Sequence, residues 1–246
     1  MRCTMAALGA GAVLLAAAGS PADVVTLGAS RDTTIFLDLP SNSNGAGPGF
    51  HCGANNLPAV RRALIAFDIA GAVPAGATID SVTLRLNMSS LQTALSTVSL
   101  HTVAGAWGEG ASNAGPSGGT GAPAQPGDAT WLDRVFGVTP WASAGGDFNP
   151  LASAAIPVTS AGLYTWTTPL MGADVQAWLD APGSADGWLL MGTETTAQTA
   201  KRFDSREHSN PALRPALEVH YTPIPAPGAL ALAGLAGALA AGRWRR

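Results

Sequence analysis

The chain has 246 residues, of which 12% are charged and 47% hydrophobic, so it is not a disordered, highly charged polymer. Its 30 glycines and 18 prolines follow no three-residue period, which excludes collagen and indicates many turns. The 13 basic and 16 acidic side chains give a net charge of −3, and no basic footprint for nucleic acid is present.

The N-terminus has the layout of a secretory signal peptide over residues 1–22. Arg2 supplies the positive charge, residues 5–18 form an apolar run, and small residues follow, so cleavage is expected after Ala18 or Ala22. The alternative is a buried N-terminal helix, which glycines within and just after the run would weaken. We therefore expect the protein to be exported.

A second apolar segment closes the chain over residues 223–246. A Pro-Ala-Pro-Gly break precedes residues 229–241, which are apolar or glycine, and an arginine cluster follows. A helix of this length rises about 20 Å, short of the ~30 Å hydrocarbon core, so we expect a temporary anchor and not a permanent span. This layout resembles the bacterial PEP-CTERM sorting tail, with Ala226 at the usual position of a glutamate. The resemblance implies an exosortase-type processing enzyme, a transient inner-membrane anchor, and delivery to the cell surface or extracellular matrix.

Between these two ends lies one domain, residues 23–222, which has to fold without covalent cross-links. It keeps 9 basic and all 16 acidic residues, so its net charge is −7, which suits multivalent cations better than an anionic polymer. Cys52 is the one cysteine outside the signal segment and cannot form an internal disulfide. About 200 residues are enough to bury a hydrophobic core.

Short apolar or alternating runs recur in this domain between clusters of glycine, proline, asparagine and serine. They predict strands at residues 33–37, 63–68, 79–88, 98–103, 163–167, 187–191 and 216–221. One short helix is expected at residues 173–180. This pattern is typical of an all-β fold, an antiparallel β-sandwich of jelly-roll type, with the signal helix and the C-terminal apolar helix outside it.

A long excursion at residues 105–150 interrupts the strand pattern. It is rich in glycine, alanine, proline and serine, yet it holds Trp107, Trp131 and Trp141. A flat indole can stack on a sugar ring, and loops on a rigid scaffold often carry binding sites. We list these three tryptophans as candidate glycan ligands, with packing of the loop as the alternative.

A series of sequence blocks from about residue 25 to 222 is similar to the DNRLRE-domain family. The blocks include Trp107-Gly108-Glu109-Gly110, Asp174 to Leu179, Phe203-Asp204-Ser205-Arg206-Glu207 and Arg214 to Leu217. The resemblance implies a jelly-roll module related to carbohydrate-binding modules. It is more specific for the fold than for a ligand.

No nucleophile, phosphate-loop or zinc-protease motif is present. Glycoside hydrolysis requires paired carboxylates, and the candidates are Glu109, Asp128, Asp133, Asp147, Glu194 and Glu207. The sequence does not pair them across a cleft, and turn capping is the alternative. We therefore expect no enzymatic activity.

Two further ligand hypotheses concern charged residues near strand ends. Calcium prefers carboxylate and carbonyl oxygens, so Asp32, Asp38 and Asp68 are candidates for a structural calcium site, with solvated turn aspartates as the alternative. Lys201 and Arg202 are the nearest cations that could meet an acidic sugar. The charged block that follows them, Phe203-Asp204-Ser205-Arg206-Glu207, could also contact such a sugar, with a partly buried ion-pair cluster as the alternative.

The sequence is compatible with three functions. The first is a non-catalytic polysaccharide-binding or matrix module, and it requires exposed tryptophan or tyrosine side chains. The second is a structural surface protein without a specific glycan ligand, in which all the indoles are packed. The third is a polysaccharide-active enzyme, which needs a cleft with two facing carboxylates.

Overall fold

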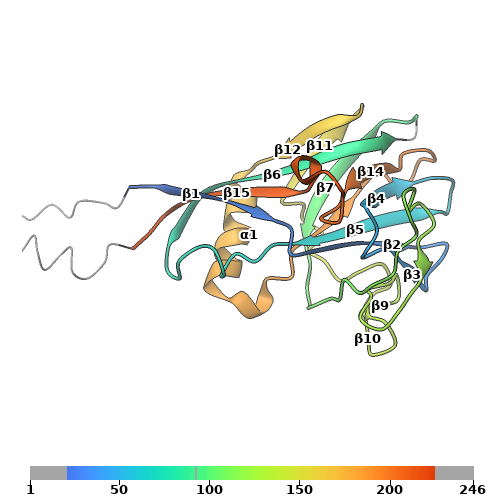
Figure 1. Cartoon of the computed structure of the whole chain (residues 1–246), viewed down its shortest axis with the longest axis horizontal. Coiled ribbons are helices and arrows are strands. Elements are labelled where there is room, and N and C mark those ends of the chain that lie inside the picture. Colours follow the sequence, from blue (N-terminus) through green and yellow to red (C-terminus); the bar gives the residue numbers. More distant parts are fainter. Residues whose placement is uncertain (1–20, 92, 225–246) are drawn as a thin grey trace, which may run out of the picture. The chain divides into compact units, whose positions relative to one another are not determined.

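Strands dominate the computed structural model, which describes residues 21–91 and 93–224 (Figure 1). The expected mostly-β fold is confirmed for these residues: one α-helix accompanies the strands, and eleven strands form a single antiparallel sheet that does not close on itself. The order is β1-β15-β6-β14-β4-β5-β13-β7-β11, with β12 also paired to β6 and β2 to β5. The expected signal segment up to residue 20 and the sorting tail from residue 225 lie outside the described residues.

The strands are short except for β6. Their bounds are β1 (Asp23–Gly28), β2 (Arg31–Phe36), β3 (Asn42–Ser43), β4 (Gly49–Ala54), β5 (Val60–Ala66), β6 (Thr78–Leu91), β7 (Ser96–Thr102), β8 (Ala122–Pro123), β9 (Asp133–Val135), β10 (Thr139–Pro140), β11 (Ala154–Val158), β12 (Gly162–Trp166), β13 (Trp188–Met191), β14 (Lys201–Asp204) and β15 (Ala216–Thr222). Two 3₁₀ turns, η1 (Pro182–Ser184) and η2 (Pro211–Leu213), precede β13 and β15 respectively.

The alternation of apolar and polar residues at 79–88 predicted a strand, and β6 lies there. Val82, Leu84, Leu86 and Met88 are buried on one face, while the residues between them are partly exposed. Successive side chains of a strand point to opposite faces, so alternation of this kind marks a strand with one face on the core.

The helix α1 (Pro169–Asp180) begins four residues earlier than the sequence predicted. The Thr168 hydroxyl accepts a hydrogen bond from the backbone N–H of Met171, and Pro169 occupies the first helical position, where a missing N–H costs nothing. Val175 and Trp178 lie on the buried face, against the core. No helix in the part of the chain that the structure describes is long and apolar enough to cross a membrane.

The buried residues form two hydrophobic clusters on opposite faces of β5 and β13. Ile65 and Leu190 belong to the larger cluster, which also contains the buried face of β6 and of α1. Their neighbours Leu64 and Leu189 belong to the smaller cluster, together with the three tryptophans of the excursion. Because adjacent residues of a strand face opposite sides, this part of the sheet is covered on both faces.

Strand β4 lies in the middle of the strand order and joins its two halves. Residues 49–52 pair with β14, whereas residues 53–54 pair with β5. The larger cluster takes residues from both sides of this connection, and the indole N–H of Trp166 on β12 donates to the carbonyl of Val98 on β7 at 3.1 Å.

Candidate functional site

The excursion at residues 105–150 is an ordered layer over the smaller hydrophobic cluster. Its tryptophans Trp107, Trp131 and Trp141 are only 2%, 6% and 5% exposed. The indole N–H of Trp107 donates to the carbonyl of Asp186 at 2.7 Å, and that of Trp141 donates to the carbonyl of Thr130 at 3.0 Å. The rings expected to stack on a sugar are therefore turned into the protein, which corresponds to the packing alternative.

Two arginines from the sheet fasten this layer. The guanidinium of Arg31 lies 4.6 Å from the ring centre of Trp107. That of Arg62 lies 4.8 Å from the ring centre of Trp131 and donates to both oxygens of Glu194, at 2.7 and 2.9 Å. Cation–π contacts and bidentate ion pairs of this kind favour one fixed geometry.

The two cations proposed for an acidic sugar belong to β14 and serve the fold. Lys201 is fully buried and donates to the carbonyl of Ala94 at 2.6 Å, and burial lowers its pKa. Arg202 donates to the Asp204 carboxylate and to the carbonyl of Pro48, each at 2.9 Å. Neither lies in the excursion that carries the three indoles.

The structure separates the three aspartates that the sequence grouped as calcium ligands. Asp38 forms an ion pair with Arg61 at 2.8 Å, and Asp68 accepts the backbone N–H of Gly71 in an exposed turn. Asp32 is fully buried on β2 and joins a different set of carboxylates. Asp38 and Asp68 do not belong to the group of carboxylates that contains Asp32, because strand ends that follow one another in the sequence need not meet in space.

The set that does meet is the acidic cluster of Asp32, Glu109 and Glu207. One oxygen from each residue lies within 4.8 Å of the others. From the sequence, Glu109 and Glu207 were candidates for catalysis and Asp32 for calcium binding, and no spacing along the chain links the three. The available signal is that Glu109 and Glu207 each stand in one of the sequence blocks that carry the family resemblance.

Hydrogen bonds hold the acidic cluster in place around Arg206. The backbone N–H of Asp32 donates to Glu109 Oε1 at 2.8 Å, and the backbone N–H of Arg206 donates to Asp32 Oδ2 at 2.9 Å. The Arg206 guanidinium bridges Glu109 Oε2 at 2.7 Å and Glu207 Oε1 at 2.9 Å. Gly110, the residue after Glu109, has a φ of +69°, and a Cβ there would lie 1.6 Å from an Asp128 oxygen. Glycine therefore allows the backbone beside Glu109 to pass close to Asp128.

Burial sets the protonation behaviour of the acidic cluster. It raises the pKa of Asp32 well above the usual range, and the charges of Glu207 and Glu109 raise it further against the opposing Arg206. Burial, with the charge of Glu109, also raises the pKa of Glu207. A positive charge placed here would favour the ionised forms.

The remaining carboxylates considered for catalysis hold loops together. Asp128 accepts backbone N–H groups from Ser112 and Gln125, and Asp147 accepts those of Ala142 and Ser143. Asp133 caps the turn before β10, accepting from the N–H of Gly137 at 3.4 Å. These contacts match the turn-capping alternative.

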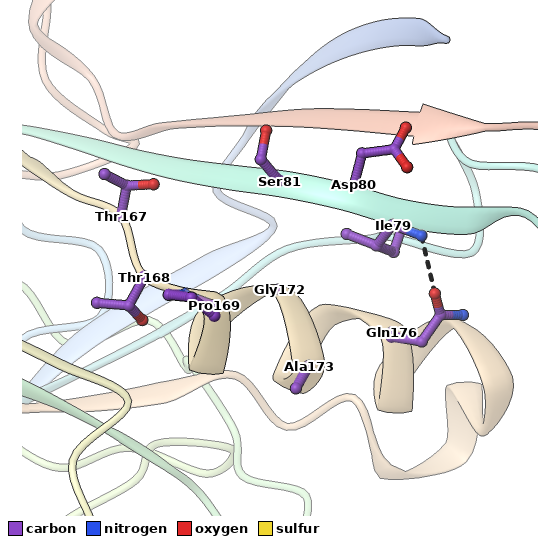
Figure 2. A pocket seen from close by; sticks show the side chains of 9 residues that line it. All are labelled: Ile79, Asp80, Ser81, Thr167, Thr168, Pro169, Gly172, Ala173 and Gln176. Atoms are coloured by element: carbon purple, nitrogen blue, oxygen red, sulfur yellow. Dashed lines mark hydrogen bonds between the residues drawn. The ribbon is translucent and has the colours of Figure 1, made fainter. Parts of the chain in front are cut away.

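Two open grooves lie elsewhere on the domain. The groove between β6 and α1, of about 520 Å³, is lined by Asp80, Ser81, Thr168 and Gln176 among others, and Gln176 accepts the backbone N–H of Ile79 at 2.8 Å (Figure 2). A second groove, of about 450 Å³, lies along β1, β15 and η2 and is lined in part by Arg85, Leu163 and Arg214.

Comparison with known proteins adds no assignment to these sites. No family model matches the chain, and no curated protein matches it. The DNRLRE-domain resemblance therefore depends on the sequence blocks alone, and the PEP-CTERM resemblance on the layout of residues 223–246 alone.

Proposed function

We propose that the chain is an exported, non-catalytic module of the cell surface or extracellular matrix, with residues 23–222 forming a jelly-roll β-sandwich. Two observations support the sandwich: β4 pairs with β14 over residues 49–52 and with β5 over residues 53–54, and the larger cluster takes residues from the strands on both sides of β4. The hydrogen bond between Trp166 and the carbonyl of Val98 ties a strand on one side to a strand on the other. Export and sorting rest on the two terminal segments.

One observation carries the choice of a structural role over specific glycan binding. All six tryptophans between residues 21 and 224 are buried, the most exposed of them at 6%. A sugar-stacking platform needs an open ring face, and here arginines or core residues cover the indoles. The structural surface or matrix protein therefore becomes the leading proposal.

Polysaccharide binding is the second candidate, and the groove beside β15 favours it. Arg85 and Arg214 line this groove together with apolar side chains, including Leu163. Guanidinium groups bind the carboxylates of acidic sugars in bidentate fashion. This candidate moves the proposed glycan site from the excursion to the groove.

Catalysis is the least supported of the three. The groove beside α1 is lined by one carboxylate, Asp80, and the groove beside β15 by none, whereas glycoside hydrolysis needs two facing carboxylates. In the acidic cluster, Arg206 already bridges Glu109 and Glu207, and neither carboxylate lines one of the two grooves.

A glycan array with the full chain, with and without calcium, separates the first two proposals. A structural module gives no saturable binding to neutral or acidic polysaccharides. Saturable binding that is lost in Arg85→Ala/Arg214→Ala and retained in Arg134→Ala, a matched arginine that does not line the groove, would reject the structural role in favour of the groove.

Sorting is tested separately by deleting residues 225–246. In a bacterium with an exosortase-type processing enzyme, the truncated chain is expected to appear in the medium or to stop before the surface. Identical distribution of the truncated and full-length chains would show that the tail is not a sorting signal.

A further inference from the structure

The acidic cluster brings three distant parts of the chain to one point. Asp32 comes from β2, Glu109 from the excursion, and Glu207 from the loop after β14. One oxygen of each lies within 4.8 Å of the others. Two oxygens bound to one calcium ion at about 2.4 Å are at most about 4.8 Å apart, so the spacing matches a shared ion.

Two buried oxygens in this cluster have no hydrogen-bond partner: Asp32 Oδ1 and Glu207 Oε2. Asp32 is itself fully buried. Buried polar atoms are nearly always satisfied, by protein, water or an ion, and a carboxylate oxygen left without a partner carries a large desolvation cost. This observation is independent of the spacing and shows that both carboxylates have an oxygen available for a further ligand.

The charge count agrees with a divalent ion. Arg206 is the guanidinium that bridges the cluster, and Arg31, the next arginine, lies 3.8 Å from Asp186. Arg31 also interacts with Glu109 but is shared with Asp186. With all three carboxylates ionised, as a bound cation would favour, the cluster therefore carries more negative charge than Arg206 alone balances. A divalent cation would neutralise this excess.

We propose that Asp32, Glu109 and Glu207 bind a divalent cation of the calcium type. Carboxylate oxygens are hard ligands and do not favour soft metal ions. A buried site requires the ion to lose some of its bound water, which disfavours magnesium relative to calcium. The ion would join β2, the excursion and the loop after β14, and its role is structural. The proposal does not depend on whether the module binds a glycan.

The test uses the full chain after treatment with a chelator, with CaCl2 as the probe. Isothermal titration calorimetry is expected to give one ion per chain, in the ~10⁻⁴–10⁻³ M range of extracellular calcium modules. At 10 mM CaCl2 the melting temperature is expected to rise by about 3–10 °C, as binding to the folded state alone requires. The same concentration of MgCl2 is expected to give a smaller rise.

Two variants and one control decide whether the ion binds at this place. Asp32→Asn and Glu207→Gln keep the side-chain shape and are expected to lose the calcium-dependent rise. Asp68→Asn removes an acidic group from an exposed turn outside the cluster, and is expected to keep it.

Two results would overturn the proposal. One is a wild-type chain whose melting temperature does not respond to calcium, which would leave a proton shared between Asp32 and Glu207 as the compensation for the buried charge. The other is a calcium response that persists in both Asp32→Asn and Glu207→Gln, which would place the ion elsewhere. Should a variant fail to fold, calcium binding to the other variant still decides between these results.

Discussion

The packing of Trp107 gives the sharpest test of the excursion as a structural layer. Trp107→Ala removes a side chain that is 2% exposed, a 2.7 Å hydrogen bond to the carbonyl of Asp186, and a partner of the Arg31 guanidinium. A buried tryptophan removes about 150–250 Å² from water, which is worth about 4–6 kcal/mol as an upper bound. Measured truncations of large aromatic residues cost about 3–5 kcal/mol, so we expect a loss near 4 kcal/mol.

Urea denaturation at 25 °C measures this loss as a change in the free energy of unfolding. Trp107→Phe keeps most of the bulk and loses the hydrogen bond, so it is expected to cost about 1–2 kcal/mol. Val138→Ala is the matched control in the same excursion, because Val138 is 76% exposed, and it is expected to change stability by less than about 0.5 kcal/mol. A Trp107→Ala variant as stable as the wild type would refute the packing argument and return this indole to the list of ligand candidates.

Three further predictions follow from other contacts. Arg62→Met removes the bidentate pair with Glu194 and leaves that partly buried carboxylate unpaired, so a loss of about 2–4 kcal/mol is expected in urea denaturation, and Glu194→Gln should lose less. Burial and two arginines lower the pKa of His51 to about 3 in the folded chain. Because the unfolded state binds the proton more readily, the free energy of unfolding falls as the pH drops from about 6.5 toward 3. His51→Gln removes this proton uptake and should flatten the pH slope by up to ~1.4 kcal/mol per pH unit. Gly108→Ala would place a Cβ 1.9 Å from a backbone oxygen, whereas Gly119→Ala meets nothing nearer than 3.9 Å, so only the first should lower the melting temperature, and equal melting of the two would contradict the close approach.

The strands with one clear period were predictable from the sequence. The run around β6 alternates between buried and partly exposed residues, and the structure places a strand at Thr78–Leu91 where residues 79–88 were expected. The helix was recognised from Val175, Trp178 and their spacing, but its start was missed because Thr168 and Pro169 act as a cap and first turn, without an apolar signal.

The central strands β4 and β14 were missed because neither shows a clear strand pattern: β14 has three charged residues out of four, and β4 contains two glycines and a histidine. Lys201 is fully buried on β14, where its ammonium reaches a backbone carbonyl, and His51 on β4 is 8% exposed. A hydrophobicity pattern reads such side chains as surface residues. For Lys201, the hydrogen bond to the carbonyl of Ala94 makes this burial tolerable.

The acidic cluster was beyond sequence reasoning for a different reason. Asp32, Glu109 and Glu207 lie in three separate segments, and their meeting depends on how the excursion docks on the sheet. The residue types were recognised as ligands of cations or as acids, but their partners were assigned by proximity to strand ends. Asp38 satisfied that criterion and instead pairs with Arg61.

A glycine- and alanine-rich excursion can hold a fixed position only if the sheet beneath it supplies the contacts that its own short strands lack. The outer face of β5 and β13 provides apolar residues for the indoles, and arginines of β2 and β5 provide the cations that cover them. No disulfide assists within the described residues, because Cys52 is buried as a free thiol. A divalent ion at the acidic cluster would add the missing link between the excursion and both β2 and the loop after β14. Calcium bound there would then do what a covalent cross-link does in other domains: it would hold three distant segments of the chain together.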